Sequence, residues 1–297
     1  MSFIREDAAQ APSKWWSYVV LTKPDVTFLV VITTVAGFYL GSRGPMDWLL
    51  LLQTVCGTML VAGGTAALNQ YAERDMDSLM RRTAARPLPS GQLQPMEVLV
   101  FGAGAIFVGS IWLALDVNGL AALIALATCL LYLGAYTPLK KETPLATAVG
   151  AFPGALPPLI GWAAATGSVS LGGWVLFAIL FFWQFPHFMS IAWMYRQDYA
   201  RAGIKMLPVV DPKGDATFAQ IIWTSLVLVP ASLLPSLIGM TGIRYFFGAL
   251  VMGMMLAQVG LWANRTRTNV RAKWLMHATV AYIPLLLVWM IFDKLGR

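Results

Sequence analysis

Three oxygen-bearing side chains recur at intervals of four residues in the first third of the chain: Asn69, Glu73 and Asp77. Residues four apart drift by only about 40° around a helix, so all three share one face. Such oxygens suit Mg²⁺, which is typically held by one or two carboxylates together with substrate phosphates. Asp75 lies about 200° round from Glu73 and would join the site only if the helix unwinds there. We therefore predict a magnesium site on these residues.

Basic side chains follow the acids closely. Arginine matches phosphate oxygens as a planar fork, and lysine supplies a point charge. Acids and bases interleaved at one place therefore predict a diphosphate bridged by the metal, with the bases stabilising the charge that leaves. Two simpler interpretations stay open: solvated or Arg-paired acids, and bases that only set membrane topology. The predicted diphosphate-binding residues are Arg81, Arg82, Arg86, Lys140, Lys141 and Arg196.

A second polar segment begins at Tyr195 and reads YRQDYARAGIKMLPVVDPKGD. Continued as a helix, the preceding residues would place Trp183, His187, Met194 and Asp198 on one stripe. Asp198 is thus a candidate fourth metal ligand. His187 is one of two histidines, and either hydrogen-bonds within a polar helix interior or faces a bound cofactor-like group.

The elements that must position these residues are membrane helices. The chain is 58% hydrophobic and 12% charged, with a mean hydropathy of +0.66, whereas soluble domains carry about 25% charged residues. The apolar runs are continuous and near 20 residues long, which argues against a β-barrel and favours helices. Nine runs are expected, at 27–42, 47–68, 96–115, 118–137, 144–166, 171–195, 218–239, 243–263 and 273–292. The predicted fold is an all-α polytopic membrane protein around a central cavity.

The basic residues predict an orientation. With the N-terminus in the cytoplasm, 17 of the 21 Lys and Arg residues fall on the cytoplasmic side. This bias predicts an odd number of spans, with the N-terminus inside and the C-terminus outside. The four on the other side are Arg43, Arg244, Lys294 and Arg297.

The motifs resemble those of the UbiA superfamily of intramembrane prenyltransferases, and most closely its haem O synthase (protoheme IX farnesyltransferase) branch. Asn69–Gly91 (NQYAERDMDSLMRRTAARPLPSG) is similar to the first acidic motif and its loop. The stretch from Trp183 (WQFPHFMSIAWMYRQDYARAGIKMLPVV) is similar to the second. Two features depart from the family: Asp25 stands where a basic residue is usual, and the second motif lacks a DxxxD pair.

The resemblance implies a Mg²⁺-dependent transfer of farnesyl from farnesyl diphosphate to a vinyl group of haem b, giving haem O. It implies catalytic roles for Asn69, Glu73, Asp77 and Asp198, and haem binding by His187, Trp183 and Tyr195. The expected setting is a prokaryotic plasma (inner) membrane, with the lipid bilayer as a partner and no nucleic acid. The product would pass to a haem A synthase or to terminal oxidase assembly.

One transmembrane domain covering 1–297 is expected, with a cytoplasmic segment 1–22 and functional loops 69–95 and 195–216. Two rival functions remain at this point. One is prenyl transfer to an aromatic quinone precursor, and the other is membrane transport. A transporter is expected to carry ionisable residues near the bilayer midplane, whereas these acids cluster at one mouth.

Overall fold

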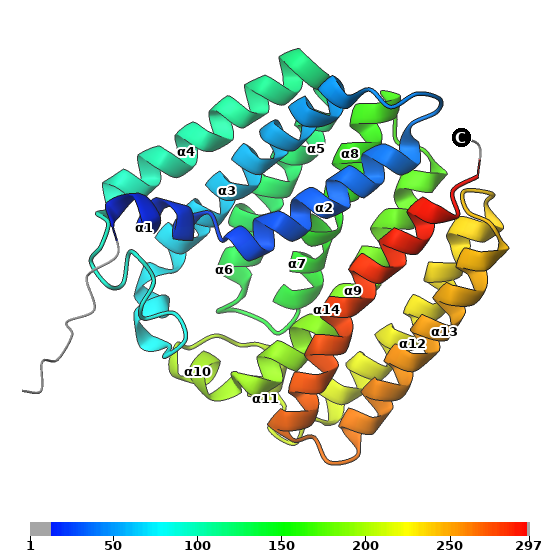
Figure 1. Ribbon diagram of the computed structural model, residues 1–297. Helices are drawn as coiled ribbons and strands as arrows, with labels where there is room; N and C mark the ends of the chain where they lie inside the picture. The colour runs from blue at the N-terminus through cyan, green and yellow to red at the C-terminus, as the bar shows by residue number, and fades with distance from the viewer. Residues whose placement is uncertain (1–12, 296–297) are drawn as a thin grey trace, which may run out of the picture.

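The computed structural model describes residues 13–295 and is helical throughout its main elements (Figure 1). Arg5, Arg297 and most of the predicted segment 1–22 lie outside these residues. The helices are α1 (Lys14–Leu21), α2 (Pro24–Gly41), α3 (Trp48–Leu79), α4 (Pro95–Trp112), α5 (Gly119–Leu130), α6 (Thr137–Leu139), α7 (Ala146–Ala155), α8 (Pro157–Thr166), α9 (Leu171–Met194), α10 (Arg196–Arg201), α11 (Leu207–Val210), α12 (Asp215–Leu237), α13 (Ile243–Asn264) and α14 (Asn269–Phe292), with π-helical turns η1 (Leu113–Val117) and η2 (Leu131–Tyr136).

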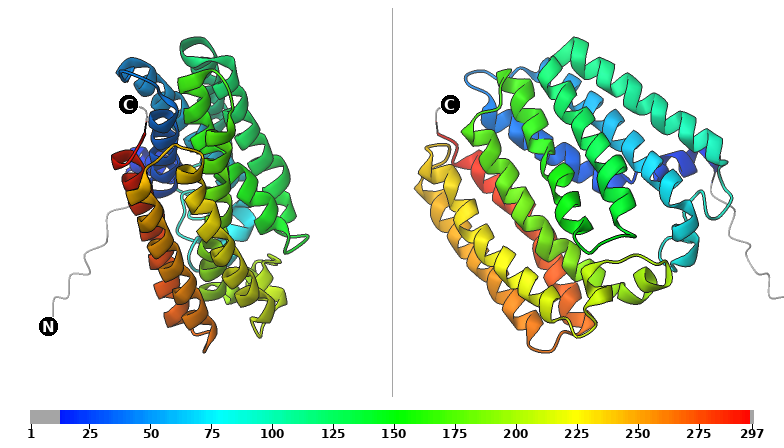
Figure 2. Two further views of the ribbon diagram at one scale, coloured as in Figure 1. Left: turned by 90° about the vertical axis from the view of Figure 1, so that its right-hand side faces the viewer. Right: turned by 180° about the vertical axis from the view of Figure 1, so that it is seen from behind.

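Nine helical stretches within residues 13–295 are long and apolar enough to cross a membrane, which confirms the predicted number. They are Pro24–Gly41, Trp48–Leu79, Pro95–Val117, Gly119–Leu139, Ala146–Thr166, Leu171–Met194, Asp215–Leu237, Ile243–Asn264 and Asn269–Phe292. In Figure 1, α2 and α14 cross the near face; seen from behind in Figure 2, α5, α7, α8 and α9 form the opposite face.

The second span differs from its predicted range. Helix α3 has 32 residues and ends at Leu79, so residues 69–79 of the predicted loop are helical. This segment contains no Gly or Pro and is rich in good helix formers, so polarity alone does not end it. The connection to α4 therefore begins at Met80. The predicted loop 195–216 likewise contains the short helices α10 and α11.

The fourth span contains a π-helical turn close to the polar end. The hydroxyl of Thr137, the residue after η2, donates to the carbonyl of Tyr132, five residues earlier, at 2.8 Å. Turns of this kind are rare and are frequent at functional sites. Here η2 turns Thr137 towards α3, where its hydroxyl accepts a hydrogen bond from Asn69.

Helices α2 and α8 pack backbone against backbone. A Cβ at Gly161 would lie 1.8 Å from the carbonyl oxygen of Thr34, and one at Gly37 would lie 2.0 Å from that of Pro158. Small residues allow such close approach in membranes, where van der Waals contact replaces the hydrophobic effect between helices. This contact fixes α2, which starts directly after Lys23.

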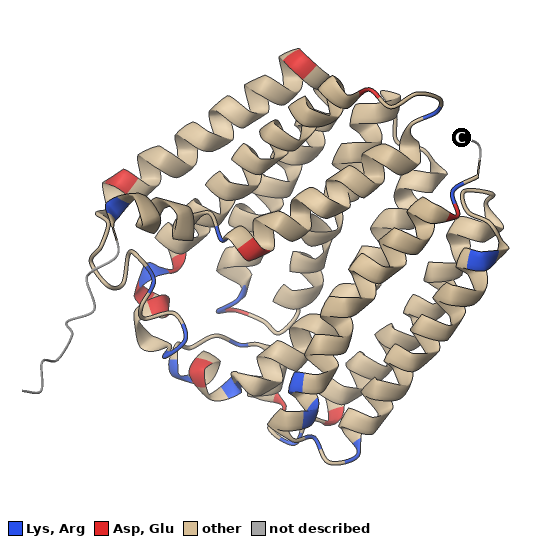
Figure 3. Cartoon of the chain, in the orientation of Figure 1, with Lys and Arg blue, Asp and Glu red and all other residues tan. Residues whose placement is uncertain are grey.

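Charged side chains gather mainly at one end of the bundle, around the connection after α3, helices α10 and α11, and the turn between α13 and α14 (Figure 3). The two loops at this end touch one another. Arg82 of the loop after α3 lies over the ring of Tyr195, in the loop after α9, at 5.1 Å. The backbone N–H of Lys205 in this second loop also donates to the carbonyl of Lys140, which follows α6, at 2.8 Å. The two polar segments singled out by the sequence are therefore neighbours.

Candidate active site

The side chains of Asn69, Glu73 and Asp77 are buried at the end of α3, with exposures of 0%, 7% and 0%. Buried carboxylates are costly unless a cation or hydrogen bonds compensate them. Each of the three residues contacts a basic side chain from a different part of the chain, described below. The site is thus a row of three oxygen-bearing side chains, each beside one basic side chain. We call the row formed by Asn69, Glu73 and Asp77 the acid face.

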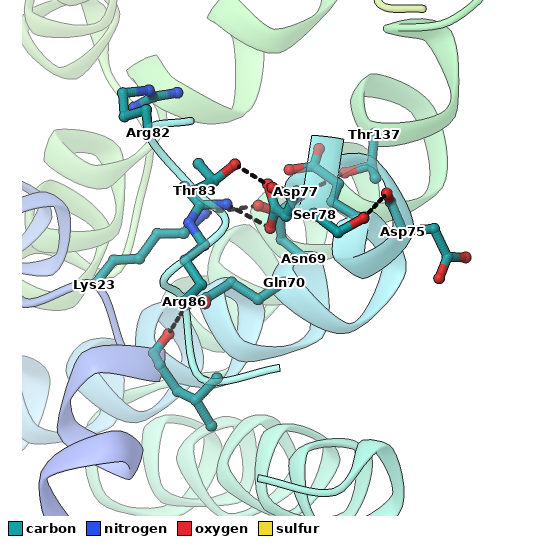
Figure 4. A network of polar contacts seen from close by, with 12 residues as sticks. Lys23, Asn69, Gln70, Asp75, Asp77, Ser78, Arg82, Thr83, Arg86 and Thr137 are labelled. Carbon is teal, nitrogen blue, oxygen red and sulfur yellow. Dashed lines mark hydrogen bonds and ion pairs between the residues drawn. The ribbon is translucent and has the colours of Figure 1, made fainter. Parts of the chain in front are cut away.

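Asn69 is held from two sides. The ammonium of Lys23 donates to its Oδ1 at 2.7 Å, and its Nδ2 donates to the hydroxyl of Thr137 at 3.2 Å (Figure 4). Burial, reinforced by the positive charge of Arg86, lowers the pKa of Lys23 to about 7. These contacts fix the amide with its oxygen towards the cation.

Glu73 forms an ion pair with Lys140, with Nζ 2.5 Å from Oε1. The same ammonium lies 4.2 Å from the ring centre of Tyr136 and 5.9 Å from that of Tyr132. Burial opposes the charge of Lys140, but Tyr136, Glu73 and Tyr132 together raise its pKa above the ordinary value. Lys140 therefore carries a permanent positive charge beside the acid face.

Asp77 is bound through one oxygen only. Arg86 donates from Nη1 to Oδ2 at 2.7 Å, while Oδ1 is buried and has no hydrogen-bond partner. The hydroxyl of Thr83 donates to the backbone carbonyl of Asp77 at 2.9 Å and fixes the start of the following turn. A buried carboxylate oxygen without a partner is uncommon in folded proteins, and it marks a place where a further positive group can bind.

Asp75 is not brought to the acid face. Helix α3 does not unwind, and the Asp75 side chain is 89% exposed, with Arg74 3.9 Å away. Figure 4 shows its carboxylate directed away from Asp77. The condition for its joining the metal ligands is therefore not met.

The remaining predicted phosphate-binding residues are placed unevenly. Arg81 and Lys141 are exposed. Arg82 contacts the hydroxyl of Tyr199 at 3.4 Å at the junction of the two loops. Arg196 instead donates to the carbonyl of Trp193 and to Asn269 at the start of α14, so it is occupied away from the acid face.

Asp198 lies on α10 and pairs with Arg201 at 2.5 Å. The predicted continuous stripe from Trp183 breaks because α9 ends at Met194 and Tyr195 leaves helical geometry. Among residues 13–295, no three His, Cys, Asp or Glu side chains converge closely enough to hold a metal. Asp198 therefore does not join Glu73 and Asp77 in one ligand set.

His187 and Trp183 form a unit between α9 and α14. Their rings stack at 5.0 Å with an interplanar angle of 15°. The Trp183 indole donates to the carbonyl of Thr279 at 2.7 Å, and Nδ1 of His187 lies 2.9 Å from the hydroxyl of the same threonine. Nδ1 is thereby engaged, which leaves Nε2 for another partner.

Sequence reasoning missed Lys23 and Thr137 as members of the site. Lys23 precedes Pro24 in the stretch LTKP, at a position with positive φ of 47° at the start of α2. A lysine at the start of a membrane span could have been recognised from the sequence as a candidate site residue. Thr137 could not, because its orientation depends on the π-helical turn.

Comparison with known proteins identifies the family. Residues 30–289 match the UbiA prenyltransferase family. A curated protein from Solibacter usitatus, "Protoheme IX farnesyltransferase", is 48% identical over 94% of this chain and 99% of its own length. Proteins of the same name from Koribacter versatilis and Salinibacter ruber are each 44% identical, over 93% and 94% of this chain and 93% and 98% of their own lengths.

Solved structures share the fold at low sequence identity. A structure described as digeranylgeranylglyceryl phosphate synthase in membranes superposes with a TM-score of 0.78 at 18% identity, covering 94% of this chain and 98% of its own. A UbiA homologue from Archaeoglobus fulgidus bound to DMAPP and Mg²⁺ gives 0.68 at 14% identity, covering 92% and 99%. The nine-span bundle is therefore that of UbiA proteins.

Proposed function

The chain belongs to the UbiA prenyltransferase family, and we propose that it transfers a farnesyl group from farnesyl diphosphate to haem b, forming haem O. Relatives named protoheme IX farnesyltransferase are 37–48% identical over more than nine-tenths of the chain, which supports this acceptor. The observation that carries the chemistry is the acid face, where Asp77 keeps one carboxylate oxygen buried and unpaired.

The donor set of the acid face suits Mg²⁺. Asn69, Glu73 and Asp77 offer amide and carboxylate oxygens, which are hard ligands, and the free Oδ1 of Asp77 can accept a cation without displacing Arg86. UbiA homologue structures from Archaeoglobus fulgidus hold Mg²⁺ with DMAPP or GPP, which supports a similar site here. A Mg²⁺ ion held by these oxygens would supply positive charge that stabilises the diphosphate as it leaves.

The cations of the acid face have a second task. Each residue of the acid face has one basic neighbour, and these neighbours can also donate to the oxygens of a bound diphosphate: Lys140, Arg86 and Lys23. As the bond to the farnesyl group breaks, negative charge grows on the diphosphate, and fixed cations stabilise it. Arg82, which contacts Tyr199 at the loop junction, is proposed to contact the headgroup as well.

The proposed reaction needs no covalent enzyme intermediate. The bond between C1 of the farnesyl chain and the diphosphate oxygen breaks, and its electron pair leaves with the diphosphate. The π electrons of a haem vinyl group then form the new bond to C1. Water adds to the resulting cation beside the porphyrin and loses a proton, which leaves a hydroxyl group. The chain's own contribution is to hold the diphosphate and to keep water from the first cation among apolar helices.

We assign haem binding to the unit formed by His187 and Trp183, with Tyr195 near the loop. The stacked rings and the contact of Nδ1 with Thr279 orient the imidazole, and its Nε2 is the nitrogen proposed for the iron. The hydrogen bond made by one ring nitrogen of a histidine determines that the other nitrogen is the one available to a metal.

We further propose that the acid face opens to the cytoplasm of a prokaryotic inner membrane. The predicted spans put 17 of the 21 basic residues at the same end as the acid face, and such an excess is typical of the cytoplasmic side. Haem O would then be released where a haem A synthase or a terminal oxidase under assembly can take it.

The test uses membranes that contain the protein, labelled farnesyl diphosphate, and either haem b or a phenolic quinone precursor as acceptor. We expect labelled product only with haem b, and its mass should exceed that of haem b by one farnesyl group and one hydroxyl group. Label on the phenolic acceptor alone would contradict the proposed acceptor and leave the family unchanged.

A further inference from the structure

An open groove lies between α13 and α14, away from the acid face. Its volume is about 610 Å³, within the range of small-molecule sites, which is roughly 300–1,000 Å³. Val259 and Trp262 of α13 line one wall, and Trp274, His277 and Ala278 of α14 line the other. We call it the α13–α14 groove.

The groove is lined by the imidazole of His277, which has no role in the proposed active site. His277 is exposed, and its ring stands edge-on to Trp274, with centroids 6.3 Å apart and an interplanar angle of 89°. Thr279, two residues further, points to the opposite face of α14 and contacts His187. Helix α14 therefore contacts His187 of α9 through Thr279 on its inner face and carries His277 on its outer face.

The groove opens at the end of the bundle where the basic residues gather. Lys273 lies one turn before His277, and Arg265 lies one turn after Trp262, and both side chains are exposed. Arg271 lies 4.4 Å over the Trp262 ring and donates to the Trp262 carbonyl at 2.7 Å, which fixes that indole.

No acidic residue occurs in the sequence between Asp215 and Asp293, and Asp215 is paired with Arg267. The cations at the mouth of the groove are therefore available to an anionic ligand. The complementary ligand is flat, apolar and anionic at one edge, and it benefits from an imidazole near its centre.

We propose that the α13–α14 groove is a docking site for haem arriving from the membrane, distinct from the site of transfer. Haem is named here on the strength of the proposed function. His277 ligates the iron, Trp262 and Trp274 contact the porphyrin, and Arg265 and Lys273 pair with the two propionates. An anionic phospholipid would use the same cations and could contact the indoles, but it would gain no metal ligand from the imidazole.

The first experiment titrates haem into the purified full chain in zwitterionic lipid nanodiscs without farnesyl diphosphate. The wild-type protein should give the Soret spectrum of imidazole-ligated haem. The comparison is made in a His187→Ala background, which removes the other proposed iron ligand: there His277→Ala should weaken binding at least tenfold, and added imidazole should restore the ligated spectrum. A titration of the double variant that overlays the His187→Ala curve would overturn the proposal.

Two matched tryptophan variants separate the groove from general membrane anchoring. Trp274 and Trp223 are 62% and 68% exposed, on different helices. Trp274→Leu should raise KM for haem several-fold, leaving kcat and KM for farnesyl diphosphate unchanged, whereas Trp223→Leu should alter none of them. Equal effects of the two would refute a specific site.

The phospholipid alternative has its own outcome. If Arg265→Gln with Lys273→Gln reduces the anionic lipid retained on purification but leaves haem affinity intact, the groove is a lipid site and the proposal fails. The outcome for the proposed function is separate. A wild-type protein that binds haem through His277 but never farnesylates it would contradict the reaction and leave the docking site standing.

Discussion

The ammonium of Lys140 and the carboxylate of Glu73 lie 2.5 Å apart, although 67 positions separate them in the sequence, and their side chains are only 12% and 9% exposed. The pair joins the connection after α6 to the end of α3. The neighbouring backbone contact from Lys205 to Lys140 adds the second loop to the same unit. One ion pair thus ties together the chain segments from which the site is built.

Breaking this pair from either side should destabilise the protein. Lys140→Met or Glu73→Gln leaves the other charge buried without a partner, which costs about 3–5 kcal/mol. The double variant removes both charges and should recover most of the stability while remaining inactive. Denaturant unfolding in detergent together with turnover measures both effects. A double variant no more stable than the singles would contradict the explanation.

Arg86 should matter through phosphate as well as through Asp77. In Arg86→Gln we expect KM for farnesyl diphosphate to rise and kcat to fall by about 10²–10³, the usual loss for one charge-stabilising donor. Arg244→Gln, an exposed arginine at the opposite end, is the matched control and should retain wild-type kinetics. Steady-state assays with haem held at saturation distinguish the two. Parallel losses in both variants would point to general destabilisation.

Mg²⁺-dependent activity should require Asp77 but not Asp75, although the two residues are only two positions apart in the sequence. Removing divalent ions with EDTA should abolish turnover, and Mg²⁺ should restore it. Asp77→Asn keeps the shape of the side chain but loses the charge at the unpaired Oδ1, so its activity should fall about 10²–10³-fold. Asp75→Asn, 89% exposed on another face, should behave as wild type. Equal loss in Asp75→Asn would place the metal elsewhere.

Much of this architecture is predictable because lipid restricts the chain to helices, so apolar runs alone define nine spans. The face shared by Asn69, Glu73 and Asp77 follows from helical periodicity, which persists as far as Leu79. These are local properties, and local sequence is sufficient for them.

The contacts that complete the site are not local. The pairing of Lys23 with Asn69 depends on the packing of α2 against its neighbours, and Thr137 is turned by a π-helical turn that no pattern indicated. Asp198 failed to join the acids for a related reason. The prediction that Asp198 shares a stripe with Trp183 and His187 required one continuous helix. The break at Tyr195 changes the direction of the residues that follow it.

The loop before α12 should lose stability in acid. Burial tends to raise the pKa of Asp211, but hydrogen bonds from Thr217, Asp215 and Gly214 together lower it. A lowered folded-state pKa stabilises the fold above the unfolded value, near 3.9, and the effect is lost as pH falls through the folded value. Asp211→Ala removes the side-chain hydrogen bonds to the first turn of α12 at neutral pH and should cost about 0.5–2 kcal/mol, as the loss of a helix cap does. Hydrogen exchange of residues 214–217 should then be faster at pH 7 and less sensitive to acid than in the wild type.

The contact between α2 and α8 should tolerate no added methyl group. In Gly161→Ala the new Cβ would lie 1.8 Å from the backbone oxygen of Thr34, which cannot move aside as a side-chain tip could. Overpacking of this kind usually costs about 1–3 kcal/mol, and displacing α2 also moves Lys23 away from Asn69. We therefore expect a lower melting temperature together with a higher KM for farnesyl diphosphate. Gly104→Ala, with no atom within 4 Å of the added Cβ, should keep the wild-type KM and should not lower the melting temperature, because alanine favours a helix more than glycine does. If Gly161→Ala lost stability with unchanged KM, the packing of α2 would not position Lys23.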